Sequence, residues 1–181
     1  MDLNIITTNE SHIQQIIDIY GYYVLNTSIT FEVEIPEYNE FKNRVDTIQE
    51  KYPFLSALID NKVVGYAYAA PLKTRKAYEY SCETTIYLDY NYKEKSIGKA
   101  LYTRLFEYLK KQNIVNLYAC ITESNKESII FHEKFGFQKT AHFHKCGFKH
   151  NKWHDVMWFE KNISDHSSTP KPFINFNNIK P

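Results

Sequence analysis

The stretch YNYKEKSIGKALY, residues 90–102, decides the fold because it joins a strand-like run to a helix-like one. Before it, YSCETTIYL (80–88) alternates its side chains between two faces, as a half-buried strand does. After it, apolar residues recur at helical spacing and predict a helix over 97–112, with a buried stripe of Ile97, Leu101, Leu105, Tyr108 and Leu109. A strand that leads through a short loop into a helix N-terminus presents free backbone N–H groups to an anion. The segment has this outline, although it lacks most of the glycines that such loops favour.

Outward from this segment, the remaining elements complete a mixed sheet with helices on its faces. We expect a strand over 2–7, an amphipathic helix after TTNES, a second helix from Pro36, and a hairpin of FLSALID and VVGYAYAAP. Further along, NLYACIT predicts a strand, SNKESIIFHEKF a helix, and FQKTAHFHKC and WHDVMWFEK two strands. The order β-α-α-β-β-β-α-β-α-β-β predicts one α/β or α+β domain over residues 1–162.

Composition bounds the kind of partner. The 181 residues suit one domain, and 22 basic against 21 acidic side chains give a formal net charge of +1. This balance excludes the basic footprint of a nucleic-acid-binding or membrane-surface protein and favours a small-molecule partner. No apolar run approaches the roughly 20 residues of a membrane span, and the N-terminus lacks a signal-peptide pattern, so we expect a cytoplasmic protein.

Residues 163–181, the cysteines and the histidines give weaker signals. The tail is rich in Ser, Pro and Asn, and we expect it to be disordered or laid over the surface. The cysteines form no C-x-x-C pair and are expected to be reduced and mostly buried: Cys82, Cys120 and Cys146. Four histidines near the C-terminal end have no recognised ligand spacing, so no metal is expected there: His142, His144, His150 and His154.

Four stretches together resemble the GNAT superfamily of acetyl-CoA-dependent N-acetyltransferases: YVLNTSITFE, AAPLKTRKAYEYSCETTIYL, KEKSIGKAL and TESNKESIIFHEKFGF. Within it, the chain is most similar to the phosphinothricin acetyltransferase family, which includes enzymes acting on methionine sulfone and methionine sulfoximine. The resemblance covers roughly residues 2–161. It implies a single-domain GNAT fold that binds acetyl-CoA.

The resemblance assigns the opening segment to the acetyl-CoA pyrophosphate. The loop frame of the superfamily falls on Lys93, Ser96 and Gly98, and the implied cofactor contacts are Lys93, Glu94, Lys95, Ser96, Ile97, Gly98 and Lys99. Lys93 replaces a usual Gln or Arg, and Glu94 adds a negative charge that would lower cofactor affinity. Ser96 replaces a Gly, which is harmless at negative φ but costs about 1 kcal/mol or more at positive φ. The alternative for this segment is an ordinary helix start.

The resemblance also implies the groups that perform the chemistry. Glu83 matches the catalytic glutamate, which takes a proton from the substrate ammonium, and partial burial would raise its pKa usefully. The alternative is a surface glutamate on a strand. His132 is implied as a proton donor to the departing thiolate or as a residue that fixes local geometry. Further acetyl-CoA contacts are implied for the strand end and the later helix, namely Thr85, Ile86, Tyr87, Leu88, Asn125 and Ser128, with helix capping as the alternative for Asn125.

For the acceptor, Lys73 and Arg75 in KTRKAY match a basic pair beside the substrate, and Arg75 is the expected carboxylate anchor. The pocket wall is expected to include Thr30, Phe31 and Tyr78. The implied activity is acetylation of the α-amino group of an amino-acid-like compound by direct transfer, in a homodimer. Acetylation of a protein N-terminus or a polyamine, and a non-catalytic CoA-binding sensor, are the alternatives. A nucleotide hydrolase is excluded because the loop lacks the G-x-x-x-x-G-K-[ST] spacing.

Overall fold

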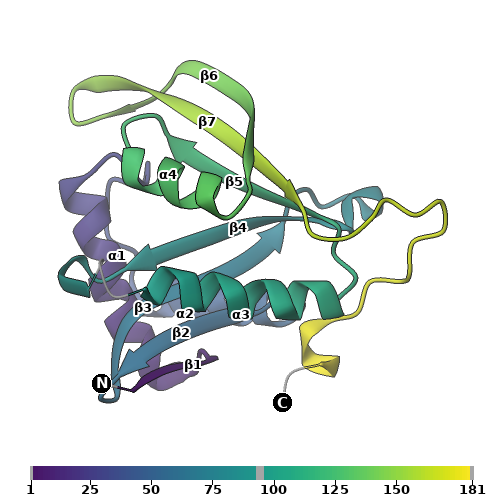
Figure 1. The fold of residues 1–181 in the computed structure, drawn as a ribbon. Helices are drawn as coiled ribbons and strands as arrows, with labels where there is room; N and C mark the ends of the chain where they lie inside the picture. The colour runs from purple at the N-terminus through teal and green to yellow at the C-terminus, as the bar shows by residue number, and fades with distance from the viewer. Residues whose placement is uncertain (1, 93–95, 180–181) are drawn as a thin grey trace.

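The computed structural model of the chain describes residues 2–92 and 96–179, which form a seven-stranded sheet between helices (Figure 1). The strands are β1 (Leu3–Thr7), β2 (Phe54–Ile59), β3 (Lys62–Pro71), β4 (Ser81–Leu88), β5 (Asn116–Thr122), β6 (Gln138–Lys149) and β7 (Lys152–Asn162). The α-helices are α1 (Ile13–Asn26), α2 (Tyr38–Gln49), α3 (Ile97–Lys111) and α4 (Lys126–Lys134). Single 3-10 turns lie at Glu10–His12, Lys76–Tyr78, Tyr90–Tyr92 and Phe176–Asn178. The expected fold class, a mixed sheet with helices on its faces, is confirmed.

The sheet has the order β1-β2-β3-β4-β5-β7-β6 and is antiparallel except where β4 meets β5. That parallel pairing holds for three residues only, from Ser81 opposite Asn116 to Glu83 opposite Tyr118. Beyond Glu83 the two strands diverge, as Figure 1 shows between the arrows of β4 and β5. The structure therefore has a wedge in the middle of its sheet, bounded on one side by residues 84–88.

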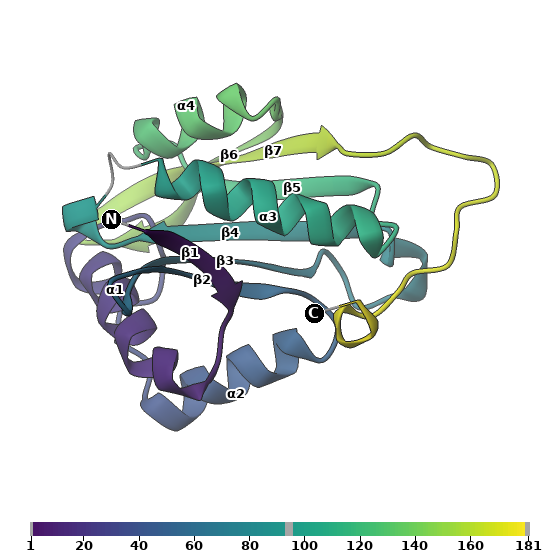
Figure 2. The same cartoon turned by 60° about the horizontal axis from the view of Figure 1, so that its bottom comes forward.

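Each face of the sheet buries its own core, because the side chains of a strand alternate between the two faces. On one face, α3 packs its buried stripe over β2–β5, with Phe131 of α4 and Phe135, which directly follows α4, beside it. On the other face, α1 and α2 cover an aromatic layer. Figure 2 shows α3 and α4 on one side of the sheet and α1 and α2 on the other. Along β4 the even-numbered residues Cys82 and Ile86 join the α3 core, so Glu83 and Tyr87 point to the α1 face.

Two expectations about single positions need correction. The second helix begins at Tyr38, not at Pro36, because Glu37 before it has an extended backbone at φ −64° and ψ 152°. Only Cys82 of the three cysteines is buried, whereas Cys120 and Cys146 are exposed. Cys120 is exposed because it alternates with the core residues Ala119 and Ile121 along β5.

The tail returns to the body of the molecule after leaving β7 (Figure 2). Phe176 is 1% exposed and packs edge-on against Tyr108 of α3, with ring centroids 5.0 Å apart. Gln112 at the end of α3 donates to the Ile174 carbonyl at 2.8 Å and to the Lys51 carbonyl at 2.6 Å. The described part of the tail, up to residue 179, thus packs against the body of the molecule, with Phe176 in the core beside α3. No helix among the described residues is long and apolar enough to span a membrane.

Candidate active site

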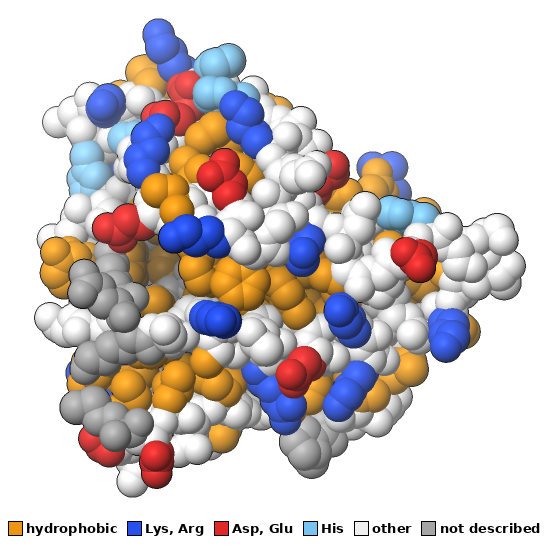
Figure 3. Space-filling view, in the orientation of Figure 1, with side chains coloured by type: hydrophobic (Ala, Val, Ile, Leu, Met, Phe, Trp, Pro, Cys, Tyr) orange, Lys and Arg blue, Asp and Glu red, His pale blue; other side chains and the backbone are white. Residues whose placement is uncertain are grey.

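The wedge between β4 and β5 opens into a groove of about 700 Å³. Strand β4, the start of α3, α1 and α4 all contribute to its lining: Tyr23, Ile29, Ile86, Tyr87, Leu88, Tyr90, Asn91, Gly98, Asn125, Glu127, Ser128 and Phe131. The face of the molecule in Figure 3 carries Lys/Arg and Asp/Glu side chains singly and interspersed around a hydrophobic band. A long ligand with both apolar and polar parts suits this groove better than a polyanion.

The backbone of β4 presents hydrogen-bonding groups to the wedge on alternate residues only. The Ser81 carbonyl accepts from Leu72, and the Asp89 N–H donates to Val64, so the odd-numbered residues of β4 face β3. By alternation, the Ile86 N–H and the Leu88 carbonyl face the wedge. The Tyr23 hydroxyl donates to that Leu88 carbonyl at 2.6 Å. Of the N–H groups of Thr85, Ile86, Tyr87 and Leu88, the structure therefore directs those of Ile86 and Leu88 toward the expected ligand.

The first turn of α3 forms the end of the groove. Among the described residues, the first backbone bond of this helix runs from the Ala100 N–H to the Ser96 carbonyl at 3.1 Å. The N–H groups of Ile97, Gly98 and Lys99 lie before it, at the helix start, where N–H groups lack a partner within the helix. A Cβ at Gly98 would lie 3.1 Å from the Phe131 ring, so a larger residue there would require the ring to shift by a few tenths of an ångström. These features favour an anion site, with the N-terminal end of the helix dipole directed at it.

Ser96 adopts the unfavourable conformation. Its φ of 56° and ψ of 12° are left-handed, and its side chain makes no capping bond. The side chains of Ser96 and Lys99 line a separate shallow depression on the far side of α3, and Ile97 is buried in the core. Because Ile97 is 0% exposed, it can contact a ligand only through its backbone. The expected contacts of Lys93, Glu94 and Lys95 lie outside the described residues.

Glu83 lies at the apex of the wedge, in the last registered pair of β4 and β5. Its half-buried carboxyl has a raised pKa because burial disfavours the charged form, and the nearby Lys73 ammonium partly offsets this effect. A carboxylate with a raised pKa is a better proton acceptor for an ammonium group. Next to it, the Thr84 hydroxyl donates to the Tyr118 carbonyl at 3.2 Å and closes the apex.

His132 is buried in α4 and does not line the groove. Its Nε2 lies 2.8 Å from the Tyr102 hydroxyl, and its Nδ1 lies 2.8 Å from the Ser128 carbonyl. Burial lowers the pKa of His132 to about 4, against the opposing effect of the Ser128 carbonyl. A neutral ring accounts for both contacts if Nδ1–H donates to Ser128 and Tyr102 O–H donates to Nε2. This environment favours the geometric role over the proton-donating role expected of His132.

Asn125 and Ser128 both line the groove at the start of α4. The Asn125 side chain caps this helix by accepting from the Ser128 N–H at 3.2 Å. Capping was the alternative role for Asn125. Because capping uses only the Oδ1 atom, the amide –NH₂ group of Asn125 can still donate to a ligand. The Ser128 hydroxyl lies 3.2 Å from His132 Nδ1.

The expected acceptor residues come from two loops. Lys73, Arg75 and Tyr78 are exposed in the β3–β4 connection, which starts where Pro71 pairs with Cys82, next to the wedge apex at Glu83. Thr30 is buried, and its hydroxyl lies 2.7 Å from the Tyr20 hydroxyl while its carbonyl accepts from Lys149 at 2.8 Å. Thr30 therefore holds its loop in place, and its neighbour Phe31, 38% exposed, is the residue that presents a surface.

Six groove residues were not predicted from the sequence: Tyr23, Ile29, Tyr90, Asn91, Glu127 and Phe131. Tyr23 and Phe131 have the apolar helical spacing of core residues, and this spacing does not distinguish a groove residue from a core residue. Glu127 and Asn91 are ordinary polar residues of a first helical turn and a loop. Only the wedge, a long-range feature, brings these six together.

Comparisons with known proteins agree on one family. A family model described as an acetyltransferase (GNAT) domain matches residues 5–158. A phosphinothricin N-acetyltransferase of Streptomyces viridochromogenes is 30% identical over 155 residues, covering 86% of this chain and 84% of that protein. An L-methionine sulfoximine/L-methionine sulfone acetyltransferase of Salmonella typhimurium is 24% identical over 157 residues, covering 84% of this chain and 90% of that protein. The crystal structure of a phosphinothricin acetyltransferase from Sinorhizobium meliloti with acetyl-CoA has a TM-score of 0.88 and 28% identity, covering 97% of this chain and 99% of that one.

Proposed function

Because the chain belongs to the GNAT family and is an acetyl-CoA-dependent N-acetyltransferase, we propose that it acetylates the α-amino group of a small amino-acid-like acceptor. Relatives that act on phosphinothricin and on methionine sulfone or sulfoximine support this acceptor class. The observation that carries the proposal is the position of a basic loop beside Glu83: this loop follows Pro71, which pairs with Cys82, and the charge of its Lys73 opposes the rise in the pKa of Glu83. An ammonium acceptor that also has a carboxylate matches an acidic side chain, Glu83, with the basic side chain of Lys73 near it.

Acetyl-CoA would lie in the groove, with its pantetheine arm in the wedge and its pyrophosphate at the first turn of α3. The wedge-facing Ile86 N–H is suited to polarise the thioester carbonyl, because the edge of β4 is free of a strand partner beyond Glu83. At the other end, the N–H groups of Ile97, Gly98 and Lys99 face an anion with the helix dipole behind them. Asn125 and Ser128 border the arm between these two points.

Glu83 acts as the general base in this proposal. It takes a proton from the acceptor ammonium, the neutral nitrogen attacks the thioester carbonyl carbon, and the carbon–sulfur bond breaks as the amide forms. Of the two protons left on the nitrogen, the amide keeps one and releases the other, and this released proton balances the one that the CoA thiolate takes up to leave as the free thiol. Because His132 is neutral and buried, we propose that it positions Tyr102 and Ser128 and that it is not the donor in this last step.

Arg75 is the proposed anchor of the acceptor carboxylate, since a guanidinium binds a carboxylate through two parallel hydrogen bonds. Lys73 adds positive charge near Glu83. Phe31 and Tyr78, 38% and 39% exposed, offer apolar wall to the acceptor side chain.

The test is thiol release from acetyl-CoA with pairs of acceptors that differ only in the carboxylate. Methionine sulfone is compared with its decarboxylated amine, and phosphinothricin and methionine sulfoximine extend the panel. The proposal predicts turnover with the amino acids and little with the amine, and a raised acceptor KM in Arg75→Ala. Lys76→Ala is the matched control, because Lys76 is an exposed cation of the same loop. Equal turnover of acid and amine would refute carboxylate recognition.

A homodimer belongs to the same proposal. The β6–β7 hairpin at the edge of the sheet exposes three large apolar side chains, Phe143, Phe148 and Trp153, each more than half exposed. Large exposed apolar groups on one hairpin favour contact with another protein surface. Sedimentation of the wild-type chain and of Trp153→Ser tests this, and a monomer at all concentrations would contradict it.

A further inference from the structure

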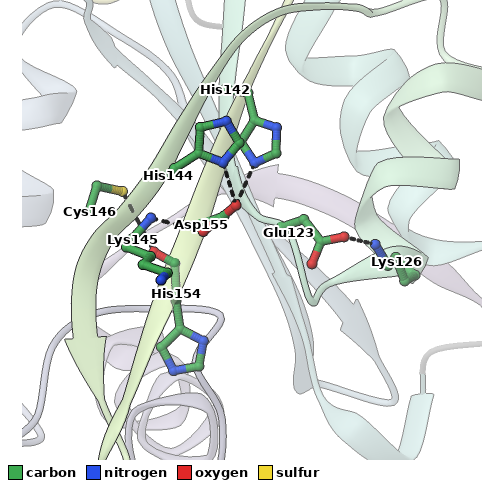
Figure 4. Close-up of polar contacts among 8 residues, drawn as sticks. All are labelled: Glu123, Lys126, His142, His144, Lys145, Cys146, His154 and Asp155. Atoms are coloured by element: carbon green, nitrogen blue, oxygen red, sulfur yellow. Dashed lines mark hydrogen bonds and ion pairs between the residues drawn. The ribbon is translucent and has the colours of Figure 1, made fainter.

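The β6–β7 hairpin carries a second cluster of chemically active side chains, apart from the acetyl-transfer groove. His142 Nε2 lies 2.8 Å from Asp155 Oδ2, and His144 Nδ1 lies 2.9 Å from the same oxygen (Figure 4). The two imidazole rings have centroids 4.1 Å apart. One potential ligand atom from each residue lies within 4.8 Å of the other two. We propose that His142, His144 and Asp155 form a binding site for a divalent transition-metal ion of the Zn²⁺ class.

The backbone of the hairpin builds this cluster. His142 and His144 are two residues apart on β6, a spacing that places both side chains on one face of a strand. Asp155 lies on β7 between the registered pairs Phe143–Val156 and Gly147–His154, where the register shifts. Lys145 in this bulge has a φ of 47°, and its N–H donates to Asp155 Oδ1 at 2.8 Å. That bond fixes the carboxylate so that Oδ2 faces both rings.

The donor set matches the proposed class of ion. Two imidazoles and one carboxylate suit Zn²⁺, Ni²⁺ or Cu²⁺, whereas Mg²⁺ and Ca²⁺ prefer oxygen ligands throughout. Tetrahedral Zn²⁺ with bonds of about 2.0–2.2 Å holds its ligand atoms about 3.3 Å apart. Each ring nitrogen therefore has to move away from Asp155 Oδ2 by roughly half an ångström, and the two nitrogens, which lie within 4.8 Å of each other, have to approach by up to about 1.5 Å. Three bonds from protein side chains to a tetrahedral ion leave its fourth position for a water molecule.

The cluster is open to solvent, and its carboxylate is ionised. The side chain of His144 is 75% exposed, and those of His142 and Asp155 are 27% exposed. The pKa of Asp155 is lowered to about 2, mainly by the Lys145 N–H and then by His144, so the carboxylate is ionised at neutral pH. On binding, each ring would present to the ion the nitrogen that now faces Asp155 and carry its proton on the other nitrogen.

The experiment measures Zn²⁺ binding to the full-length protein without a histidine tag, by equilibrium dialysis with metal analysis, and records the visible spectrum with Co²⁺. We expect one ion per chain for the wild type, no competition by millimolar Mg²⁺, and a tetrahedral Co²⁺ spectrum. His144→Gln is the main variant, because this exposed side chain contributes little to folding. Loss of a residue that only hydrogen-bonds to a metal ligand weakens metal binding by roughly 10–100-fold. His144→Gln removes a ligand itself, so it should weaken Zn²⁺ binding by at least this factor.

Two further variants make the result specific. Asp155→Asn keeps an acceptor for the Lys145 N–H but removes the charge, and it should weaken binding as His144→Gln does. His166→Gln is the matched control: its imidazole is exposed in the tail, where it contacts Asn116, and binding should be unchanged. Absence of Zn²⁺ binding by the wild type, or equal affinity of His144→Gln and wild type, would overturn the proposal.

Discussion

Replacing Ser96 by glycine should stabilise the protein, because Ser96 occupies a left-handed conformation at φ 56°. An L-residue in this region costs roughly 1–2 kcal/mol. Glycine relieves this strain but loses more chain entropy on folding, by about 0.4–1 kcal/mol. The difference leaves a net stabilisation of about 0.5–1 kcal/mol. For a chain of this length it corresponds to a rise in Tm of about 1–4 °C.

Ser96→Ala is the control that separates backbone strain from the hydroxyl group. Alanine keeps the Cβ that causes the strain and removes only the Oγ, which makes no capping bond. Urea unfolding at equilibrium should therefore show a gain for Ser96→Gly and none for Ser96→Ala. A gain of equal size in both variants, or a loss in Ser96→Gly, would refute the strain argument.

Three other predictions concern the second layer of the site and the tail. The pKa of His132 is about 4 in the folded chain and 6.5 ordinarily, so the unfolded chain takes up this proton first as the pH falls. The contribution of neutral His132 to the free energy of unfolding is therefore complete above pH 6.5 and is lost as the pH falls toward 4. At about 1.4 kcal/mol per pH unit, wild type should lose about 3 kcal/mol more unfolding free energy than His132→Gln over that range, measured in urea; parallel pH curves would contradict this. Gly147→Ala should raise the acceptor KM and spare acetyl-CoA binding, since its Cβ would lie 2.1 Å from the Phe31 ring and displace it; an unchanged KM in thiol-release assays would argue against Phe31 as pocket wall. Phe176→Ala should cost about 3 kcal/mol of unfolding free energy, at the low end of buried Phe→Ala changes because the tail can detach from Tyr108, while kcat stays unchanged; equal urea midpoints would show that the tail contributes nothing.

The elements followed from local sequence signals. The alternation in residues 80–88 predicts β4, and the apolar stripe of residues 97–109 predicts α3. Both predictions succeed because the spacing of apolar residues along an element reflects which of its faces is buried. Glu83 could be singled out from its motif before its surroundings were known. Its raised pKa, however, depends on burial and on Lys73, ten residues away in the chain.

Features that depend on contacts between distant segments could not be predicted. The register between β4 and β5 ends after Glu83, and no pattern within either strand indicates where it ends. The His142–His144–Asp155 cluster needs the pairing of β6 with β7, so the histidines alone gave no ligand set. The backbone angle of Ser96 was likewise open until the start of α3 was placed. The division into a domain over residues 1–162 and an accessory tail stays a prediction.

The most direct test of the account is the rate of acetyl transfer by Glu83→Gln in a single turnover with bound acetyl-CoA and methionine sulfone. The glutamine keeps the size of the side chain and removes its ability to accept a proton. We predict a rate lower than wild type by at least about 100-fold at pH 7, with an unchanged Kd for acetyl-CoA. The gap should narrow at higher pH, where water removes the proton from the acceptor ammonium. A Glu83→Gln rate within twofold of wild type at pH 7 would contradict the assignment of Glu83 as the general base.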